Sequence, residues 1–310
     1  MKIAIFFVGK LDDAGFNSSA LAGVRAAEAS NSIEIKIVAD VRYDQAEIRE
    51  RLEEVLPAVD GLVFIGGQGN AFTPEMAERF PEKLFAIVQG ERVGPNLSSY
   101  DVRQEESAFL AGYLAARMTR TGVVAHLSGH RVLPGLKGRA AYVAGALYAD
   151  PSVTVLTGFC GTQDDNGVAG SWADAMIGKG ADVLFTMLNG ARQGAIDACK
   201  AGGTRQIGNA LDWCAEDPDV FVASAIARID LGVETAISDM LQGVRRGEVM
   251  ELGLSSGDYV SLSFAPDVAD HLRQEIAGVA DEIRSGALTL PTHYGGVEFE
   301  LEAASCQASA

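Results

Sequence analysis

The first thirteen residues read Met1-Lys2-Ile3-Ala4-Ile5-Phe6-Phe7-Val8-Gly9-Lys10-Leu11-Asp12-Asp13. The six apolar side chains from Ile3 to Val8 predict a strand that is buried on both faces, as in a parallel sheet. A helix rich in Ala is predicted next, over Ser19 to Ala29. A strand followed by a helix is the first half of a right-handed βαβ unit. Asp12 and Asp13 therefore lie at the carboxyl end of a strand, where α/β proteins bind their ligands.

The same order of strand and helix repeats along the chain. Further strands are predicted at 33–38, 61–65, 84–88, 123–127, 153–156, 183–187, 206–208, 220–224 and 259–263. Helices are predicted between them at 45–56, 74–79, 105–118, 138–149, 171–177, 193–201, 231–242 and 265–285. Short apolar strands that alternate with helices indicate the α/β class with parallel sheets. The pattern restarts near residue 123, which predicts two Rossmann-like halves.

No linker rich in Pro, Ser or charge separates these halves, so we expect two lobes that share crossover strands. The expected N-terminal lobe is 1–103 plus about 229–254. The expected C-terminal lobe is 104–228 plus about 255–290, and 291–310 is expected to be a frayed tail. A ligand would lie between the lobes, at the carboxyl ends of the strands.

Composition narrows the class of ligand. The chain of 310 residues carries 25 Lys and Arg against 42 Asp and Glu, a formal charge of −17, and 48% of its residues are hydrophobic. This balance is typical of a globular protein, and the negative charge excludes a nucleic-acid binder. No apolar run is long enough for a transmembrane helix. A small neutral molecule remains compatible with the charge.

Motifs for cofactors and catalysis are weak. No GxGxxG follows the first strand and no P-loop is present, so no cofactor is expected. The nearest loop, Ile65-Gly66-Gly67-Gln68-Gly69-Asn70, lacks the P-loop lysine and instead leaves room beside a ligand or a lobe contact. Asp12 and Asp13 lack a third carboxylate at metal-binding spacing, so no metal site is expected. Asp13 can bind a polar ligand or cap the next helix, and both alternatives stay open.

The histidines and cysteines give little indication of a catalytic or metal-binding site. His126 and His130 lie in or just after a predicted strand, and no nucleophile motif accompanies them. The four cysteines, Cys160, Cys199, Cys214 and Cys306, show no zinc-binding spacing. Whether Cys199 and Cys214 pair in a disulfide stays open. We therefore do not expect an enzyme.

Aromatic side chains recur near predicted strand ends, where flat faces suit a flat heterocycle. This set consists of Phe16, Phe72, Tyr100, Phe159 and Trp213. Core packing is the alternative for each of them taken singly. Asn189-Gly190 also follows a predicted strand and precedes a helix, whose free N–H groups can bind acceptor atoms.

Several segments in order resemble the basic membrane protein family, the purine-nucleoside receptor type of ABC-transporter substrate-binding protein. Asp13-Ala14-Gly15-Phe16-Asn17 is similar to its Asp-x-Ser/Gly-Phe-Asn signature. Asn96-Leu97-Ser98-Ser99-Tyr100 and Glu106-Ser107-Ala108-Phe109-Leu110-Ala111-Gly112 are similar to its crossover and following helix. Tyr142-Val143-Ala144-Gly145-Ala146 with Pro151 resembles a further segment. The resemblance spans residues 1 to about 265.

The resemblance implies the type I periplasmic-binding-protein fold and capture of a purine nucleoside between the lobes, with an ABC permease as partner. It places Asp13, Phe16 and Asn17 at the cleft, and Phe159 near a further aromatic position of the family. Together with the strand-end residues, the expected ligand-binding set is Asp13, Phe16, Asn17, Gln68, Tyr100, Phe159, Asn189, Gly190, Asp212 and Trp213.

Two departures from the family bear on the ligand. In the stretch Gly208-Asn209-Ala210-Leu211-Asp212-Trp213 only the second Asp of the family's pair is kept, and the family's lysine is replaced by Ala227. The resemblance implies that these groups hold the ribose. Since unpartnered buried hydroxyls cost about 1–3 kcal/mol each, we hypothesise a preference for a free nucleobase over a nucleoside.

The compartment stays open. Family members are commonly exported lipoproteins, but here Met1 abuts the first strand and no Cys precedes Cys160. As the chain stands we expect a cytoplasmic protein, or one of the periplasm or cell envelope if a leader was trimmed. The alternative function is a cytoplasmic sensor of a purine-type ligand. Less favoured is an enzyme that uses Asp12, Asp13 and Asp212 on such a ligand.

Overall fold

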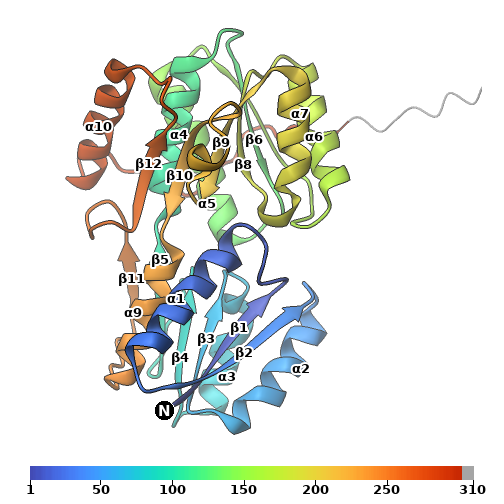
Figure 1. The fold of residues 1–310 in the computed structure, drawn as a ribbon. Helices are drawn as coiled ribbons and strands as arrows, with labels where there is room; N and C mark the ends of the chain where they lie inside the picture. The colour runs from blue at the N-terminus through green and yellow to red at the C-terminus, as the bar shows by residue number, and fades with distance from the viewer. Residues whose placement is uncertain (302–310) are drawn as a thin grey trace, which may run out of the picture.

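The computed structural model describes residues 1–301, which form two lobes stacked end to end (Figure 1). Each lobe has a six-stranded sheet flanked by helices. The chain is thus an α/β protein with the two-lobed architecture expected from the alternation of strands and helices.

The lower lobe in Figure 1 has the strand order β11-β5-β4-β3-β1-β2, and all neighbouring strands are parallel. These strands are β1 (Lys2–Val8), β2 (Glu34–Val41), β3 (Gly61–Ile65), β4 (Leu84–Val88), β5 (Leu97–Val102) and β11 (Val249–Leu252). Its helices are α1 (Phe16–Ser30), α2 (Gln45–Val55), η1 (Leu56–Ala58), α3 (Gly69–Arg79) and α9 (Ile229–Leu241). Residues from two distant parts of the sequence therefore build this lobe.

The upper lobe has the order β12-β10-β9-β8-β6-β7, in which only β12 runs antiparallel to its neighbour. These strands are β6 (Val123–Ser128), β7 (Thr154–Phe159), β8 (Val183–Met187), β9 (Arg205–Ala210), β10 (Phe221–Ala227) and β12 (Val260–Phe264). Its helices are α4 (Gln104–Met118), α5 (Leu133–Ala149), α6 (Asn166–Gly178), η2 (Asn189–Ala191), α7 (Arg192–Gly202), α8 (Trp213–Glu216) and α10 (Asp270–Arg284).

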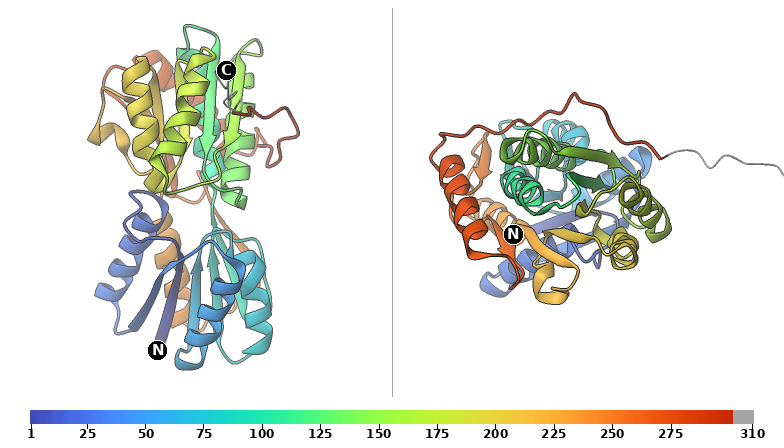
Figure 2. Two further views of the ribbon diagram at one scale, coloured as in Figure 1. Left: turned by 90° about the vertical axis from the view of Figure 1, so that its right-hand side faces the viewer. Right: turned by 90° about the horizontal axis from the view of Figure 1, so that it is seen from above.

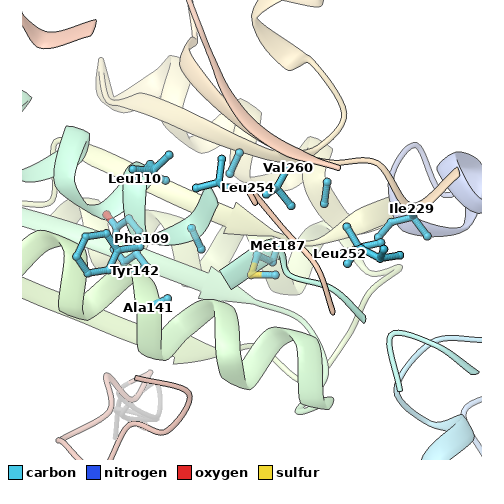
Figure 3. Packing of buried hydrophobic residues seen from close by; sticks show 14 of the residues in the cluster. Phe109, Leu110, Ala141, Tyr142, Met187, Ile229, Leu252, Leu254 and Val260 are labelled. Carbon is cyan, nitrogen blue, oxygen red and sulfur yellow. The ribbon is translucent and has the colours of Figure 1, made fainter. Parts of the chain in front are cut away.

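The chain passes between the lobes three times, after β5, after β10 and after β11. One apolar cluster runs through this junction, because Val102, Ile229 and Leu252 belong to the same buried cluster as the core of the upper lobe. Among the cluster residues drawn in Figure 3, Ile229 and Leu252 lie at one end and Phe109 and Tyr142 at the other. The hinge is therefore packed and not a loose linker.

Two strands, β5 and β11, differ from the sequence expectation, which assigned neither as a strand. Strand β5 lacks the expected apolar pattern because it contains polar residues. Two of these have buried or partly buried partners: Ser99 Oγ donates to Arg92 O at 2.6 Å, and Tyr100 Oη donates to Asp239 Oδ2 at 2.8 Å. Several helices also begin earlier than expected, and α3, α5 and α6 each begin five residues earlier. Helix α6 begins after Asp165, whose carboxylate accepts from Val168 N at 3.0 Å.

The segment after α10 is held against the upper lobe as far as the described residues extend. Phe299 N donates to Thr157 O at 2.8 Å, and Glu298 pairs with Arg131 and Arg139. The expectation of a frayed tail is therefore wrong for this part of the chain. Residues 302–310 lie outside the description.

Cys160, Cys199 and Cys214 are free thiols, so Cys199 and Cys214 do not pair. Cys306 lies outside the described residues. Within residues 1–301, the helices are too short or too polar to cross a bilayer. The same residues hold no group of three His, Cys, Asp or Glu side chains that could bind a metal ion.

Helices α4 and α5 pack with almost no space between their backbones. A Cβ on Gly112 would lie 2.0 Å from Tyr142 O, and one on Gly145 would lie 2.0 Å from Phe109 O. Real Cβ atoms do not approach carbonyl oxygens so closely, so any side chain would force the helices apart. The two glycines therefore set the distance between these helices.

We predict that Gly112→Ala lowers the free energy of unfolding by about 1–3 kcal/mol, because the added methyl group overpacks the α4–α5 contact. Urea denaturation followed by circular dichroism measures this change. The control is Gly278→Ala in α10, where a Cβ has no neighbour within 4 Å. Ala is the better helix former, so the control is expected to be neutral or stabilising by up to about 1 kcal/mol. Equal effects from both variants would contradict the close contact.

Candidate ligand-binding cleft

A cavity of about 470 Å³ lies between the two lobes, and loops that follow the strands of both sheets line it. This volume is within the range of small-molecule sites. The lower lobe contributes the loops after β1, β2 and β3, with Asp13, Tyr43 and Gln68 among their residues. The upper lobe contributes the loops after β6, β7 and β8, with His130, Asp164 and Asn189 among theirs. The cavity thus occupies the carboxyl edge of both sheets.

Asp13 organises the loop between β1 and α1. Its carboxylate accepts from the backbone N–H groups of Gly15 at 3.0 Å, Asn17 at 2.9 Å and Ser18 at 2.9 Å. The bonds from Asn17 and Ser18 satisfy free N–H groups of the first turn of α1. Burial raises the pKa of Asp13, while the backbone hydrogen bonds act in the opposite direction. Asp13 is therefore a helix cap whose side chain also borders the cavity.

Asn17 has a similar structural role. Its Nδ2 donates to Val8 O at 2.9 Å and to Lys10 O at 2.8 Å, which ties the start of α1 to the end of β1. The Asp-x-Gly-Phe-Asn segment therefore shapes the loop that presents Phe16, whose partly buried ring lines the cavity. Both Asp13 and Asn17 reach the cavity wall with several hydrogen-bonding positions already occupied.

The lobes touch around the cavity. The rings of Tyr43 after β2 and His130 after β6 stack with 4.7 Å between centroids and 7° between planes. A Cβ on Gly15 would lie only 2.8 Å from Asn189 Oδ1, and one on Gly67 only 2.9 Å from Pro134 Cδ. Each contact joins a residue of one lobe to a residue of the other. The structure is therefore a closed form.

Side-chain amides are the main polar groups of the cavity wall. Gln104 and Asn209 are buried, and Asn209 Nδ2 donates to Gln104 Oε1 at 3.2 Å. Gln68 and Asn189 are partly exposed and line the same cavity. An amide offers both donors and acceptors and carries no charge. The wall can therefore recognise a neutral molecule whose edge alternates donors and acceptors.

Charged groups lie mostly in exposed parts of the wall. Lys10, Asp40, Arg42 and Asp164 line the cavity and are exposed, and Arg42 pairs with Glu47. Asp13 is the buried charged residue of the lining, and it already accepts three hydrogen bonds from the backbone. The buried part of the cavity therefore offers little net charge to a ligand.

Arg192 lies behind this wall and is 2% exposed. Its Nη1 donates to Thr186 Oγ1 at 3.0 Å, and its guanidinium lies 4.5 Å from the ring centre of Trp213. Burial lowers the pKa of Arg192 to about 10, and the charge of Asp13 opposes this shift. Arg192 thus contacts the end of β9, because its Nη2 donates to Asn209 O at 3.4 Å, and it does not line the cavity.

Half of the expected ligand-binding set borders the cavity. Asp13, Phe16, Asn17, Gln68 and Asn189 line it. The other five residues do not line it: Tyr100, Phe159, Gly190, Asp212 and Trp213.

Each of these five has another environment. Tyr100 bonds Asp239, Phe159 lies between Arg131 and Arg139, and Trp213 stacks on Arg192. Asp212 accepts from Ser263 Oγ at 2.7 Å, and Gly190 lies against Gln163 and Asp164.

Sequence reasoning missed Tyr43, Gln104, Ser128 and Asn209 as site residues, and it gave His130 little weight. Tyr43 and Ser128 follow the rule that residues at strand ends line the site, which could have found them. Gln104 begins a helix, and Asn209 lies inside a strand whose predicted end was two residues too early. Only the approach of the lobes brings Tyr43 to His130.

His126 is buried next to the cavity wall. Its Nδ1 lies 2.9 Å from Thr157 Oγ1 and its Nε2 lies 3.0 Å from Ser128 Oγ, so both ring nitrogens have partners. Burial lowers its pKa to about 3, and the positive charge of Arg139 acts in the same direction. His126 is therefore a neutral residue of the core that orients Ser128.

We predict that His126 makes the protein less stable as the pH falls. The unfolded chain takes up this proton near pH 6.5 and the folded protein only near pH 3, so stability falls between these values by about 1.4 kcal/mol per pH unit. Urea denaturation at several pH values gives the free energy of unfolding as a function of pH. Between about pH 3 and 6.5, the slope of this function for His126→Gln should be smaller by about 1.4 kcal/mol per pH unit, which corresponds to one proton. The exposed His271→Gln serves as the control and should keep the parent slope. Identical slopes for all three proteins would contradict the burial of a neutral His126.

Comparison with known proteins shows what the chain is similar to. Basic membrane protein D of Borreliella burgdorferi is 29% identical over 264 residues, covering 81% of this chain and 76% of that protein. A protein of Bacillus subtilis named transcriptional activator protein med is 23% identical, covering 89% and 86%. Among solved structures, a solute-binding protein of an ABC transporter system from Aeropyrum pernix superposes with a TM-score of 0.83 at 21% identity, covering 94% and 93%.

One protein family matches nearly the whole chain. The family described as ABC transporter substrate-binding protein PnrA-like matches residues 1–291. The match takes in both lobes and every loop that lines the cavity. The chain therefore belongs to the PnrA-like family of ABC transporter substrate-binding proteins, which bind solutes without catalysis and have the type I periplasmic-binding-protein fold.

Proposed function

We propose that this solute-binding protein captures a neutral, flat heterocycle of the purine type and delivers it to an ABC permease. The observation that carries the proposal is the set of six side-chain amides on the cavity wall: Asn17, Gln68, Gln104, Gln163, Asn189 and Asn209. The edge of a purine base alternates donors and acceptors, and Asn and Gln recognise such edges with paired hydrogen bonds. A charged solute would instead require a buried opposite charge to bind it.

Flat apolar surfaces support the same ligand class. Phe16 lines the cavity from the lower lobe, and Pro134, Val132 and Met187 line it from the upper lobe. An aromatic ring against a heterocycle adds about 0.5–1.5 kcal/mol beyond the area that it buries. The rings of Tyr43 and His130 also line the cavity. A wall that combines amides with aromatic and apolar side chains fits a nucleobase better than a sugar, which exposes hydroxyls on all sides.

Within the purine class we propose a preference for the free base over the nucleoside. The family resemblance links three positions to ribose, which are Ala210, Asp212 and Ala227, and none of them lines the cavity. Asp212 bonds Ser263, and Ala227 is a buried methyl group in β10. Ribose hydroxyls placed here would lack these partners and would lose about 1–3 kcal/mol for each one left unpaired.

Closure of the lobes links capture to transport in this proposal. Ligand contacts from both lobes favour the closed form over the open one, because only the closed form makes all of them. A permease can then recognise the relative position of the two outer lobe ends. The packed hinge and its three chain crossings make closure a movement of rigid lobes.

A ligand sensor on the same fold is the second candidate. It is favoured by the relative named transcriptional activator protein med and by a solved structure titled transcriptional activator of the comK gene from Bacillus halodurans, with a TM-score of 0.75 at 19% identity. Ligand-dependent binding to an ABC permease would support transport. Ligand-dependent binding to a regulatory partner with no effect on uptake would support sensing.

Calorimetric titration with adenine, guanine, adenosine and guanosine tests the proposed ligand. We expect a free base to bind at least tenfold more tightly than its nucleoside, since about 1.4 kcal/mol corresponds to a factor of ten. Clearly tighter binding of a nucleoside would contradict the preference for a free base. Binding of ribose or an amino acid in place of all four compounds would contradict the purine class.

Two variants near the end of β9 test whether a residue contacts the base or only lies near the cavity. Asn209→Ala removes a cavity amide and is expected to weaken base binding about tenfold or more. Asp212→Ala, three residues away and outside the cavity, is expected to leave the affinity unchanged. If Asp212→Ala weakens nucleoside binding as strongly as Asn209→Ala weakens base binding, the assignment of the cavity wall is wrong.

A further inference from the structure

The chain after α10 forms a strap, residues 294–301, on the outer surface of the upper lobe. Figure 2 shows this part of the chain leaving α10 and crossing over the helices of the lobe. Phe299 N donates to Thr157 O at 2.8 Å, which pairs the strap with the exposed edge of β7. The ring of Phe299 also packs edge-on against Trp172, with 6.0 Å between centroids. The strap is thus bound by both its backbone and its side chains.

Glu298 is the charged anchor of the strap. Its Oε1 accepts from Arg131 Nη1 at 3.0 Å, its Oε2 accepts from Arg131 Nη2, and its Oε1 also accepts from Arg139 Nη1. These hydrogen bonds lower the pKa of Glu298 to about 2. The Arg139 side chain is only 5% exposed. Without Glu298, a buried guanidinium would lose its carboxylate partner.

The two arginines connect the strap to the cavity. Both guanidinium groups lie over the ring of Phe159, at 4.7 Å for Arg131 and 5.0 Å for Arg139. Arg131 lies between His130 and Val132 in the sequence, and both of these residues line the cavity. His130 is also the residue that stacks on Tyr43 of the other lobe. Three residues in sequence therefore join the strap, the cavity wall and the contact between lobes.

We propose that Glu298 is a positioning residue for the ligand cavity. Through Arg131 and Arg139 it fixes the loop 129–132, so that His130 is already placed to stack on Tyr43 when the lobes close. Less conformational freedom is then lost on closure, because this loop is ordered beforehand. The inference depends on the cavity and the closed form, and it does not depend on the purine class.

Hydrogen exchange of the ligand-free protein tests this role. Val132 N donates to His130 O at 3.0 Å and Leu136 N donates to Val132 O at 3.0 Å, so exchange at these amides reports on the loop. In Glu298→Gln we expect exchange in peptides covering 129–136 to be at least fivefold faster, with peptides from β9 unchanged. The exposed Glu300→Gln is the matched control and should behave as the parent protein. Faster exchange confined to 294–301 would overturn the proposal.

A second variant isolates the link to the cavity. Arg131→Met removes the ion pair between Glu298 and the loop 129–132 and keeps the Arg139–Glu298 pair. We expect faster hydrogen exchange in residues 129–136 and unchanged exchange in residues 294–301. Unchanged exchange in 129–136 would overturn the proposal. Where adenine binds the parent protein, both variants should release it several-fold faster. If adenine does not bind the parent, the proposed ligand fails, and the exchange data alone still decide the role of Glu298.

Discussion

The cavity depends on one constraint, which is that the two lobes are tied by three chain crossings through a packed hinge. The lobes cannot separate or slide freely, so the loops at the two sheet edges always face each other. Charged contacts reinforce this geometry, because Lys137 on α5 of the upper lobe lies 2.5 Å from Asp101 in β5 of the lower lobe. Both side chains are largely buried, and breaking such a pair leaves an uncompensated charge.

This geometry assigns different roles to residues that look alike in the sequence. Asp13 and Asn17 occupy the most recognisable segment of the chain, yet most of their hydrogen bonds hold the β1–α1 loop. In the proposed function, ligand recognition depends instead on amides such as Asn209, which lie outside this segment. Two residues of a family signature can therefore serve the shape of the loop, while the proposed function assigns specificity to the neutral groups around it.

The fold was largely predictable, because alternating apolar strands and helices have few other arrangements. The site was predictable where a residue lies within a few positions after a strand, as Gln68 and Asn189 do. Tyr100, Phe159 and Trp213 also lie near strand ends, but hydrogen bonding and cation–π packing hold them away from the cavity. Tyr43 and His130 meet only across the closed cleft, and no pattern within one lobe indicates such a contact. The strap was missed because its residues show no regular periodicity.

The central claim is that the closed cleft holds one neutral heterocycle of the purine type. Native mass spectrometry of the protein, purified from its own host without denaturation, tests this claim without assuming any ligand. The account predicts a bound mass of one purine-type base, released when the lobes are unfolded. A bound sugar, amino acid or charged nucleotide would contradict it.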